Sequence, residues 1–478
     1  MESLIRQLYA YTELKMYSFH TPGHKGRRDL LAPVVFPDYD LTELPGLDML
    51  HNPQGVLAEA QKKAAEFYRA EETFFLVNGA TVGNQAMFLA LLPKAKTKKV
   101  RIERKAHRSV IGALILSGLT PEYIPSVIHP DFNLPLGLDV AQLTADLEHI
   151  DALHLTSPSY YGTVSDLAYV LRQRDKHKPN LPVMVDQAHG AHFTFGLFPQ
   201  GAVEQGADLV VHSTHKTLPA LTQAAMLHVQ GTRIDRFVLR DILGILQTSS
   251  PSYLLLASLE QALDIRAESL WNDLFEEVQL LRQKLNGPLR ILTEQDCGSY
   301  GIKEVDWSKI LVNVSPLGIS AAEAVEYLRH NFRIEPELWD EFNILFVLGL
   351  GNKPEEVRAL SAALEELVKR FRSGLNSAKR SNANASQRSN VPVYPSSLPP
   401  VRLSPREAWL STKRKIAVKE SLGKISAETI SVYPPGIPLI ACGEEITEEV
   451  LTYLLQADKY NWQGWQGSNR GEILVVDM

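Results

Sequence analysis

The segment HSTHKTLPALTQ (residues 212–223) directly follows the apolar run ADLVV (207–211). Such a run has the length and composition of a buried strand, so Lys216 stands just beyond a strand end. A lone lysine in this position would be read as one half of a structural ion pair. The role of Lys216 therefore depends on which other segments the fold brings beside it.

Strands and helices alternate in the sequence around this lysine. Apolar or β-rich runs, each followed by a helix-like segment or a polar turn, occupy residues 74–77, 100–103, 153–156, 183–186 and 209–212. This alternation predicts an α/β fold with a mainly parallel sheet. Polar residues follow the five runs at once, namely Asn78, His107, Ser157, Asp186 and Ser213. Because ligands bind at the carboxyl ends of such strands, we expect these positions to converge on one crevice.

Composition limits the possible classes of function. The chain has 478 residues, 45% apolar and 22% charged, with a net charge of −6. This balance gives no reason to expect nucleic acid or an anionic membrane as a partner. The two cysteines, Cys297 and Cys442, are far apart in the sequence and have no metal-type spacing. They predict no disulfide framework and indicate a reducing compartment. The N-terminus has no signal-peptide pattern, and no apolar stretch is long enough to span a bilayer, so a cytoplasmic protein is predicted.

A chain of this length predicts more than one domain. A smaller α/β domain is expected where strand-like runs (310–314 and 344–348) accompany two helical patterns (321–330 and 354–370). A segment rich in Ser, Asn and Pro then reads as a linker. The predicted divisions are an N-terminal arm (1–30), a large cofactor-binding domain (31–287), the small domain (288–372), the linker (373–400) and a C-terminal α+β domain (401–478).

Asp186 changes the interpretation of Lys216. It ends the apolar strand LPVMVD, and a sheet can set a carboxylate and an amine side by side. This pair suits pyridoxal 5'-phosphate (PLP): the lysine forms a Schiff base, and the aspartate keeps the pyridine nitrogen protonated so that the ring accepts electrons. The turn NGAT also places Gly79, Ala80 and Thr81 at a helix N-terminus, where backbone N–H groups favour a phosphate.

Histidines support two readings. Ser213 and His215 flank Lys216 and could donate to the same phosphate, and His107 could stack on the cofactor ring rather than merely cap a helix or fill the core. Alternatively, three close histidine pairs could bind metal, at 20/24, 189/192 and 212/215. Their spacings match no usual helical pair, and no carboxylate base is obviously placed, so PLP is favoured and no metal is predicted.

Several segments resemble the PLP-dependent ornithine/lysine/arginine decarboxylases. The lysine-bearing signature is HSTHKTLPALTQAAMLHVQG, and the further matches are FHTPGHKG (19–26), DQAHG (186–190), QTSSPSY (247–253), SPREA (404–408) and YPPGIPL…GE (433–444). The resemblance covers nearly the whole chain. It implies the fold type I architecture of the aspartate-aminotransferase class and a homodimer, or possibly a higher oligomer, with a shared active site.

The resemblance also implies roles for individual residues. Lys216 would form the Schiff base, Asp186 would face the pyridine nitrogen and His107 would stack on the ring. Phosphate contacts would come from Thr81, Ser213 and His215, with Ser250 or its neighbours reaching in from the second subunit. His189, in the matched DQAHG segment, would also bind the cofactor. The substrate-binding candidates in the matched segments are Glu444, Tyr433 and His24.

The sequence departs from the family pattern at three places. Gln187 follows Asp186 where the family often has glutamate, Ala80 removes a hydroxyl from the phosphate turn, and SPSYYG stands where an NPTY-type sequence is frequent. None of these changes removes an essential group. Because the chain starts almost directly at the HTPGHK segment, it resembles the short biosynthetic members, which lack an N-terminal receiver-like domain.

The activity implied is decarboxylation of a basic L-amino acid, arginine or lysine rather than ornithine, in polyamine biosynthesis. Another PLP reaction such as transamination, or a catalytically silent regulatory homologue, are the alternatives. A buried substrate cation needs a carboxylate, and Glu444 is the candidate after the YPPGIPL turn. In the competing reading, Glu444 opens the helix suggested by GEEITEEV.

Overall fold

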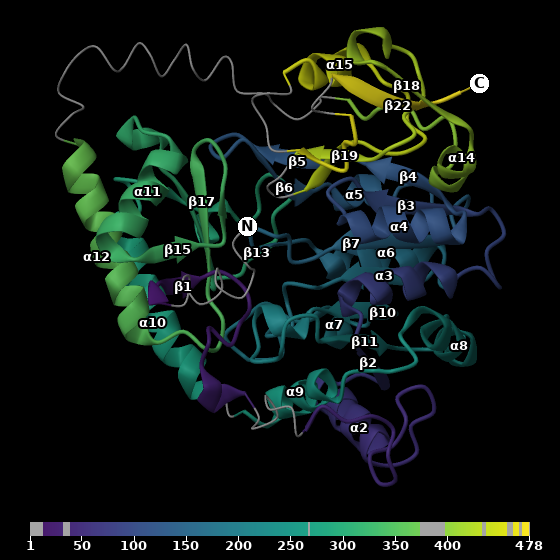
Figure 1. Ribbon diagram of the computed structural model, residues 1–478, viewed down its shortest axis with the longest axis horizontal. Helices are drawn as coiled ribbons and strands as arrows, with labels where there is room; N and C mark the ends of the chain where they lie inside the picture. Colours follow the sequence, from purple (N-terminus) through teal and green to yellow (C-terminus); the bar gives the residue numbers. More distant parts are fainter. Residues whose placement is uncertain are drawn as a thin grey trace.

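A seven-stranded sheet forms the centre of the large domain in the computed structural model (Figure 1). The model describes residues 13–31, 39–265, 268–372, 397–432, 436–456, 462–467 and 471–477. The strand order is β2 (Glu72–Leu76), β11 (Ala225–Val229), β10 (Leu209–His212), β9 (Val183–Asp186), β7 (Ala152–Thr156), β3 (Lys99–Glu103) and β4 (Thr120–Ile124). Neighbouring strands from β10 to β4 pair in parallel, whereas β11 is antiparallel to both of its neighbours. The predicted, mainly parallel sheet and its five predicted strands are confirmed.

Two strands of this sheet were not predicted. β4 carries a proline and a glutamate and lies at the sheet edge, so its sequence lacks a continuous apolar run. β11 returns antiparallel beside β10 without an intervening helix, which departs from the alternation used to find the other strands.

Helices cover both faces of the sheet. α3 (Gly79–Leu89), α4 (Arg108–Ser117) and α8 (Arg236–Leu246) share one apolar cluster with β10 and β3. α5 (Val140–Leu143), α6 (Leu167–His177) and α7 (Ala202–Gln205) pack on the other face. Gly83 lets α3 lie close to the sheet, because a Cβ at this position would be 2.5 Å from Val211 Cγ2. α3 is thus fixed directly over the strand that leads to Lys216.

The small domain has a four-stranded sheet in the order β12 (Arg290–Ile291), β14 (Lys309–Asn313), β17 (Asn343–Val347) and β16 (Leu338–Trp339). α11 (Ala321–Phe332) and α12 (Pro354–Arg372) confirm the two predicted helices. α10 (Glu268–Leu285) packs along α12 (Figure 1), and its Trp271 also packs on His192 and Phe198 of the large domain.

The N-terminal arm joins the small domain to the Lys216 segment. β1 (Tyr17–Phe19) pairs in parallel with β15 (Ile334–Pro336). Further along, the Gly23 N–H donates to the His215 carbonyl at 2.7 Å, and the Gly351 N–H donates to the Gly23 carbonyl at 2.9 Å. A Cβ at Gly23 would lie 2.6 Å from the Thr217 carbonyl carbon, which explains the glycine in TPGHKG.

The C-terminal domain packs on the large domain beside α4 (Figure 1). Its helices are α14 (Pro405–Leu410) and α15 (Glu448–Leu454). The predicted helix start SPREA is confirmed, because Ser404 and Glu407 form a capping box at α14. The strands pair as β18 (Lys413–Ala417) with β22 (Glu472–Val476), and as β20 (Ile437–Ile440), β19 (Ile430–Val432) and β21 (Trp462–Gln463).

Among the remaining elements are α2 (Val56–Tyr68), α9 (Tyr253–Asp264), β5 (Ser126–His129), β6 (Leu134–Leu138), β8 (Thr163–Val164) and β13 (Glu304–Val305). Of these, α2 and α9 pack on each other and on β2, while β5 pairs with β6 and β8 pairs with β13. Throughout the ranges that the model describes, we find no helix with the length and apolar character needed to cross a membrane.

Candidate active site

Lys216 ends the 3-10 turn Thr214–Lys216 that follows β10. Its Nζ lies 2.8 Å from His189 Nε2 and 6.0 Å from the centroid of the Tyr160 ring. Loss of hydration in this crevice lowers the pKa of Lys216 to about 8, although the nearby Asp186 charge opposes the shift. Near neutral pH, a far larger share of this amine is therefore the neutral nucleophile than for an exposed lysine.

Asp186 ends β9, the strand beside β10, and Val211 is its partner in the register. Its side chain is buried, and its carboxylate accepts hydrogen bonds from Asn84 Nδ2 at 2.8 Å and from the Ala188 N–H at 3.0 Å. Asn84 comes from α3, so the helix that covers the sheet also orients the aspartate. The charge of this carboxylate acts on the Lys216 amine and favours its protonated form, so the two adjacent strand ends bring these groups close together.

His107 is the N-cap residue of α4. Its Nδ1 accepts from the Ser109 N–H at 3.2 Å and lies 2.9 Å from Ser109 Oγ. Ser109 Oγ in turn accepts from Asn84 Nδ2 at 2.9 Å, which links the histidine to the Asp186 network. The ring is open to solvent at the crevice but closely surrounded by protein, and this partial loss of hydration lowers the pKa of His107. His107 therefore caps α4, which was the alternative to a cofactor role. The cap uses only Nδ1 and does not exclude stacking of the ring on a cofactor, which stays a prediction.

The predicted phosphate turn starts α3. Gly79 adopts a positive φ of 74°, and the N-cap residue Asn78 makes no side-chain cap to the helix N-terminus. Thr81 is exposed in the first turn, whereas Ala80 is buried. No side chain of the N-cap residue therefore occupies the first N–H groups of this helix. Such N–H groups, in a turn that contains glycine, can bind an anion.

Ser250 lies in an exposed loop next to this turn. The Thr248 N–H donates to Asn78 Oδ1 at 3.3 Å, and Ser250 Oγ lies 3.2 Å from Thr248 Oγ1. His51 Nε2 holds the same loop through the Thr248 carbonyl at 2.8 Å. The loop thus borders the phosphate turn of its own chain, and a contact from a second subunit stays a prediction.

Ser213 and His215 flank Lys216 as the sequence indicated. Ser213 is buried, and His215 Nδ1 donates to the Ala224 carbonyl at 3.0 Å. Burial lowers the pKa of His215 to about 4. In the neutral ring, Nε2 is then an acceptor, so His215 could donate to a phosphate only if the phosphate raised its pKa.

Sequence reasoning missed three charged side chains of the crevice, namely Lys309, Glu337 and Lys25. Lys309 Nζ lies 3.2 Å from His189 Nδ1. Glu337 accepts from Tyr160 Oη at 2.5 Å and from the Thr21 N–H at 2.6 Å. Burial raises the pKa of Glu337, but these hydrogen bonds and the neighbouring lysines outweigh it, and the net pKa is lowered. Lys25 donates to the Val347 carbonyl at 2.9 Å, and burial lowers its pKa to about 7.

Glu444 does not reach this crevice as an unpaired carboxylate. Its oxygens accept from Arg104 Nη1 at 2.5 Å and Nη2 at 2.9 Å, and Oε2 also accepts from the Ala441 N–H at 2.7 Å. This buried pair joins the C-terminal domain to the segment after β3, and the geometry favours that structural role over the predicted substrate contact. The competing reading is also wrong, because α15 starts after Thr447.

The structure does not test the substrate-binding roles predicted for His24 and Tyr433. His24 lies on the N-terminal arm, where its Nδ1 accepts from the Gly26 N–H at 3.0 Å. Tyr433 lies outside the described residues.

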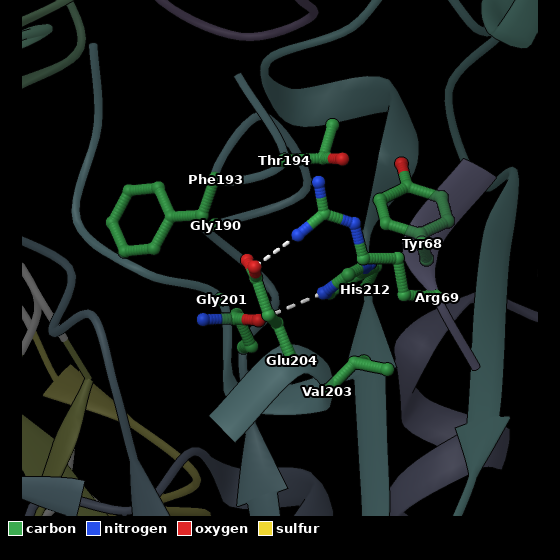
Figure 2. Close-up of a pocket in the computed structure, with 10 residues that line it drawn as sticks. Tyr68, Arg69, Gly190, Phe193, Thr194, Gly201, Val203, Glu204 and His212 are labelled. Carbon is green, nitrogen blue, oxygen red and sulfur yellow. Dashed lines mark hydrogen bonds and ion pairs between the residues drawn. The ribbon is translucent and has the colours of Figure 1, made fainter. Parts of the chain in front are cut away.

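The paired histidines point in different directions. His189 faces Lys216, whereas His192 Nε2 pairs with Asp306 at 3.1 Å. His212 bonds Gln187 Oε1 at 2.9 Å and lines a small pocket with Tyr68, Arg69, Thr194 and Glu204 (Figure 2). Gln187, one of the departures from the family pattern, thus supports His212. Within the described ranges, no group of three or more His, Cys, Asp or Glu side chains could hold a metal ion.

The residues at the strand ends fit the chemical groups of PLP. A lysine amine with a lowered pKa, a buried carboxylate and an open helix N-terminus match the aldehyde, the pyridine nitrogen and the phosphate, respectively. The site and the mainly parallel sheet thus define a fold type I PLP enzyme. In agreement, the fold matches an aspartate aminotransferase from Thermus thermophilus with a TM-score of 0.51 over 67% of this chain and 94% of that one, at 15% identity.

Comparison with known proteins identifies the family. Residues 3–300 match the major domain of the Orn/Lys/Arg decarboxylases, and residues 391–464 match their C-terminal domain. The chain is 31% identical to an arginine decarboxylase of Halalkalibacterium halodurans, over 95% of this chain and 93% of the relative. It is 34% identical to the uncharacterized protein YaaO of Bacillus subtilis, over 99% and 98% of the two chains. Lysine decarboxylase A from Pseudomonas aeruginosa has the same fold, with a TM-score of 0.76 at 20% identity over 99% of this chain and 80% of that chain. The chain belongs to the Orn/Lys/Arg decarboxylase family and is a PLP-dependent amino-acid decarboxylase.

Proposed function

We propose that this enzyme decarboxylates a basic L-amino acid, arginine or lysine in preference to ornithine, and releases the corresponding amine for polyamine synthesis. The observation that carries the proposal is the amine of Lys216, with its lowered pKa, at the strand end next to the buried carboxylate of Asp186. Support for the substrate class comes from the arginine decarboxylases that match over more than nine-tenths of this chain.

Lys216 is the residue that we assign to cofactor attachment. Its amine, with the lowered pKa, would hold the cofactor through the cofactor's aldehyde carbon. PLP, when bound, accepts the electron pair that remains when CO₂ leaves the substrate. We assign the phosphate to the N-terminus of α3, with Gly79, Ala80 and Thr81, and to Ser213 and His215 beside the lysine.

Asp186 would supply the negative charge that keeps the pyridine nitrogen of the cofactor protonated. Its two hydrogen bonds, from Asn84 and from the Ala188 N–H, fix the carboxylate and leave it ready for this contact. His107 presents a neutral ring at the crevice, and we assign it to the face of the cofactor. Its cap on α4 holds it in place, so stacking requires little ordering of the side chain.

We further propose a cytoplasmic homodimer with an active site shared between subunits. The exposed loop at 248–250 borders the phosphate turn, and α8, close to this loop, exposes 80% of Phe237 and 79% of Ile245. Apolar side chains of this size on one short helix suit a subunit interface. In the dimer, Ser250 would complete the phosphate site of the partner chain.

Release of labelled CO₂ tests the proposal directly. Purified protein with PLP is incubated separately with carboxyl-labelled arginine, lysine or ornithine. The keto acid and amine products are measured in parallel with the released CO₂. We expect CO₂ and the matching amine from arginine or lysine, with slower turnover of ornithine. Keto-acid formation without CO₂ would support a transaminase instead, and no turnover of any basic amino acid would refute the proposed substrate class.

A further inference from the structure

The imidazole of His189 bridges two lysine amines. Its Nε2 lies 2.8 Å from Lys216 Nζ, and its Nδ1 lies 3.2 Å from Lys309 Nζ. The ring is buried and packs on Tyr160, with 4.5 Å between the ring centroids. Because His189 follows β9 and Lys309 begins β14, the bridge joins the large domain to the small domain.

Hydrogen-bond chemistry restricts the charges along this bridge. Burial and the two neighbouring lysines lower the pKa of His189 well below its usual value, so the ring is neutral. A neutral imidazole offers one donor and one acceptor nitrogen, and an ammonium group can only donate. Two ammonium groups would need two acceptor nitrogens. Both hydrogen bonds can therefore form only if at least one of the two lysines is a neutral amine.

The surroundings favour Lys309 as the ammonium. Burial lowers the pKa of Lys309, which is fully enclosed, but the charges of Asp306 and Glu337 oppose this shift and stabilise its protonated form. Its stem is held closely, because a Cβ at Gly162 would be 2.7 Å from both Lys309 Cβ and Cγ. Lys216, in contrast, is half-buried at the crevice, where attack on an aldehyde needs a free lone pair.

We propose that Lys309 is a positioning residue: it donates to His189 Nδ1, so that His189 Nε2–H donates to Lys216 Nζ and keeps Lys216 a neutral amine. The reverse state is reached when one proton moves from Lys309 to Nδ1 and another from Nε2 to Lys216. Neither state changes the total charge, so the bridge can also return a proton to Lys216. The inference rests on the proposed cofactor attachment at Lys216, but it concerns the amine before any cofactor is present.

Other charged groups face the two lysines and must be included in any titration. Lys216 faces Asp186 and Glu337 as well as the neutral rings of His107 and His215, and Lys309 faces Asp306, Glu337 and Lys25. The two carboxylates near Lys216 raise its pKa, and Lys309 lowers it. Removing Lys309 should therefore make Lys216 a stronger base.

Reductive methylation of the full-length, cofactor-free chain measures this directly. Short pulses are applied from about pH 6 to 10, and peptide mass spectrometry gives the methylated fraction of Lys216. We expect a midpoint at about pH 8 in the unaltered protein. Lys309→Met should raise the midpoint by about one unit, so that reactivity at pH 7 falls roughly tenfold. Lys309→Arg keeps a permanent donor to His189 and should preserve the low midpoint.

His189→Phe separates the bridge from simple charge repulsion. This variant keeps the charge of Lys309 and a ring at position 189 but has no N–H to donate to Lys216, and we expect its midpoint to rise as in Lys309→Met. Lys25→Met is the matched control, because Lys25 is a lysine of the same crevice that donates to backbone carbonyls rather than to His189. It should leave the Lys216 midpoint in place.

Two outcomes would overturn the inference. If His189→Phe keeps the original midpoint, Lys309 acts through its charge alone. If Lys25→Met raises the midpoint as much as Lys309→Met does, the effect is a general one of the crevice. Thermal unfolding checks that each variant is folded, and if Lys309→Met does not fold, His189→Phe and Lys309→Arg decide the test. The methylation midpoint of Lys216 is measured without turnover. A failure of the proposed activity would therefore be seen separately, in the CO₂ assay.

Discussion

The buried pair of Glu444 and Arg104 gives a quantitative test of how the C-terminal domain is held. Both side chains are almost fully enclosed, and three hydrogen bonds of 2.5–2.9 Å engage the carboxylate. Removing one partner of a buried pair leaves an uncompensated charge, at a cost of about 3–5 kcal/mol. Glu444→Ala should thus lower the free energy of unfolding by about this amount, and Glu444→Gln, which keeps an acceptor, by about 1.5–3 kcal/mol.

This prediction is tested by calorimetry, which gives the Tm, and by steady-state kinetics, which give KM. Glu444→Gln should lower the Tm clearly and leave KM for the basic substrate nearly unchanged. The matched control is Glu445→Gln, because Glu445 pairs with the exposed Arg402 at 2.7 Å and an exposed pair contributes at most about 1 kcal/mol. A Glu444→Gln enzyme with an unchanged Tm and a strongly raised KM would refute the structural role and restore the substrate contact.

The other predictions concern the cofactor, acid stability and the dimer. Asp186→Asn should preserve the fold but lower kcat severalfold or more, since a neutral amide does not keep the pyridine nitrogen protonated; near-normal kcat in this variant argues against the assigned contact. Burial lowers the pKa of His154 to about 4, and neither ring nitrogen has a partner among the described residues. Unfolding frees this ring to take up a proton below about pH 6.5, so stability should fall as the pH drops from 6.5 towards 4, by about 1.4 kcal/mol per pH unit for this group. His154→Leu should flatten the acid limb in urea titrations, and an unaltered limb would contradict this. Finally, inactive Lys216→Ala chains should partly rescue chains with Ser250→Ala and Ser252→Ala after mixed refolding; if the loop substitutions leave activity and cofactor affinity intact, the contact between subunits is absent.

The sequence predicted best what depends on local pattern. The strands ending at Asp186 and His212 are continuous apolar runs because helices cover both faces of the sheet, and such runs are visible without the fold. The position of Lys216 just beyond a strand end followed directly. The helix starting after Ser404 was equally readable, because its capping box lies within four residues.

Contacts between distant segments were not predictable in the same way. Arg104 and Glu444 are 340 residues apart, and nothing in either local sequence reveals the partner that makes Glu444 structural. Lys309 looked like a polar residue at the start of a strand, and its contact with His189 arises only when the small domain packs on the large one. Tyr160 and Glu337 meet for the same reason. Family resemblance located the segments, but the charges around Lys216 required the three-dimensional arrangement.

Among the several lysines of this crevice, Lys216 is the one that we assign to the cofactor. The most direct test is borohydride reduction of the purified protein with PLP, followed by peptide mapping with mass spectrometry. We expect a stable pyridoxyl group on Lys216, with none on Lys309 or Lys25, although all three amines have lowered pKa values. A label on either of those two lysines, or turnover without any label on Lys216, would contradict this assignment.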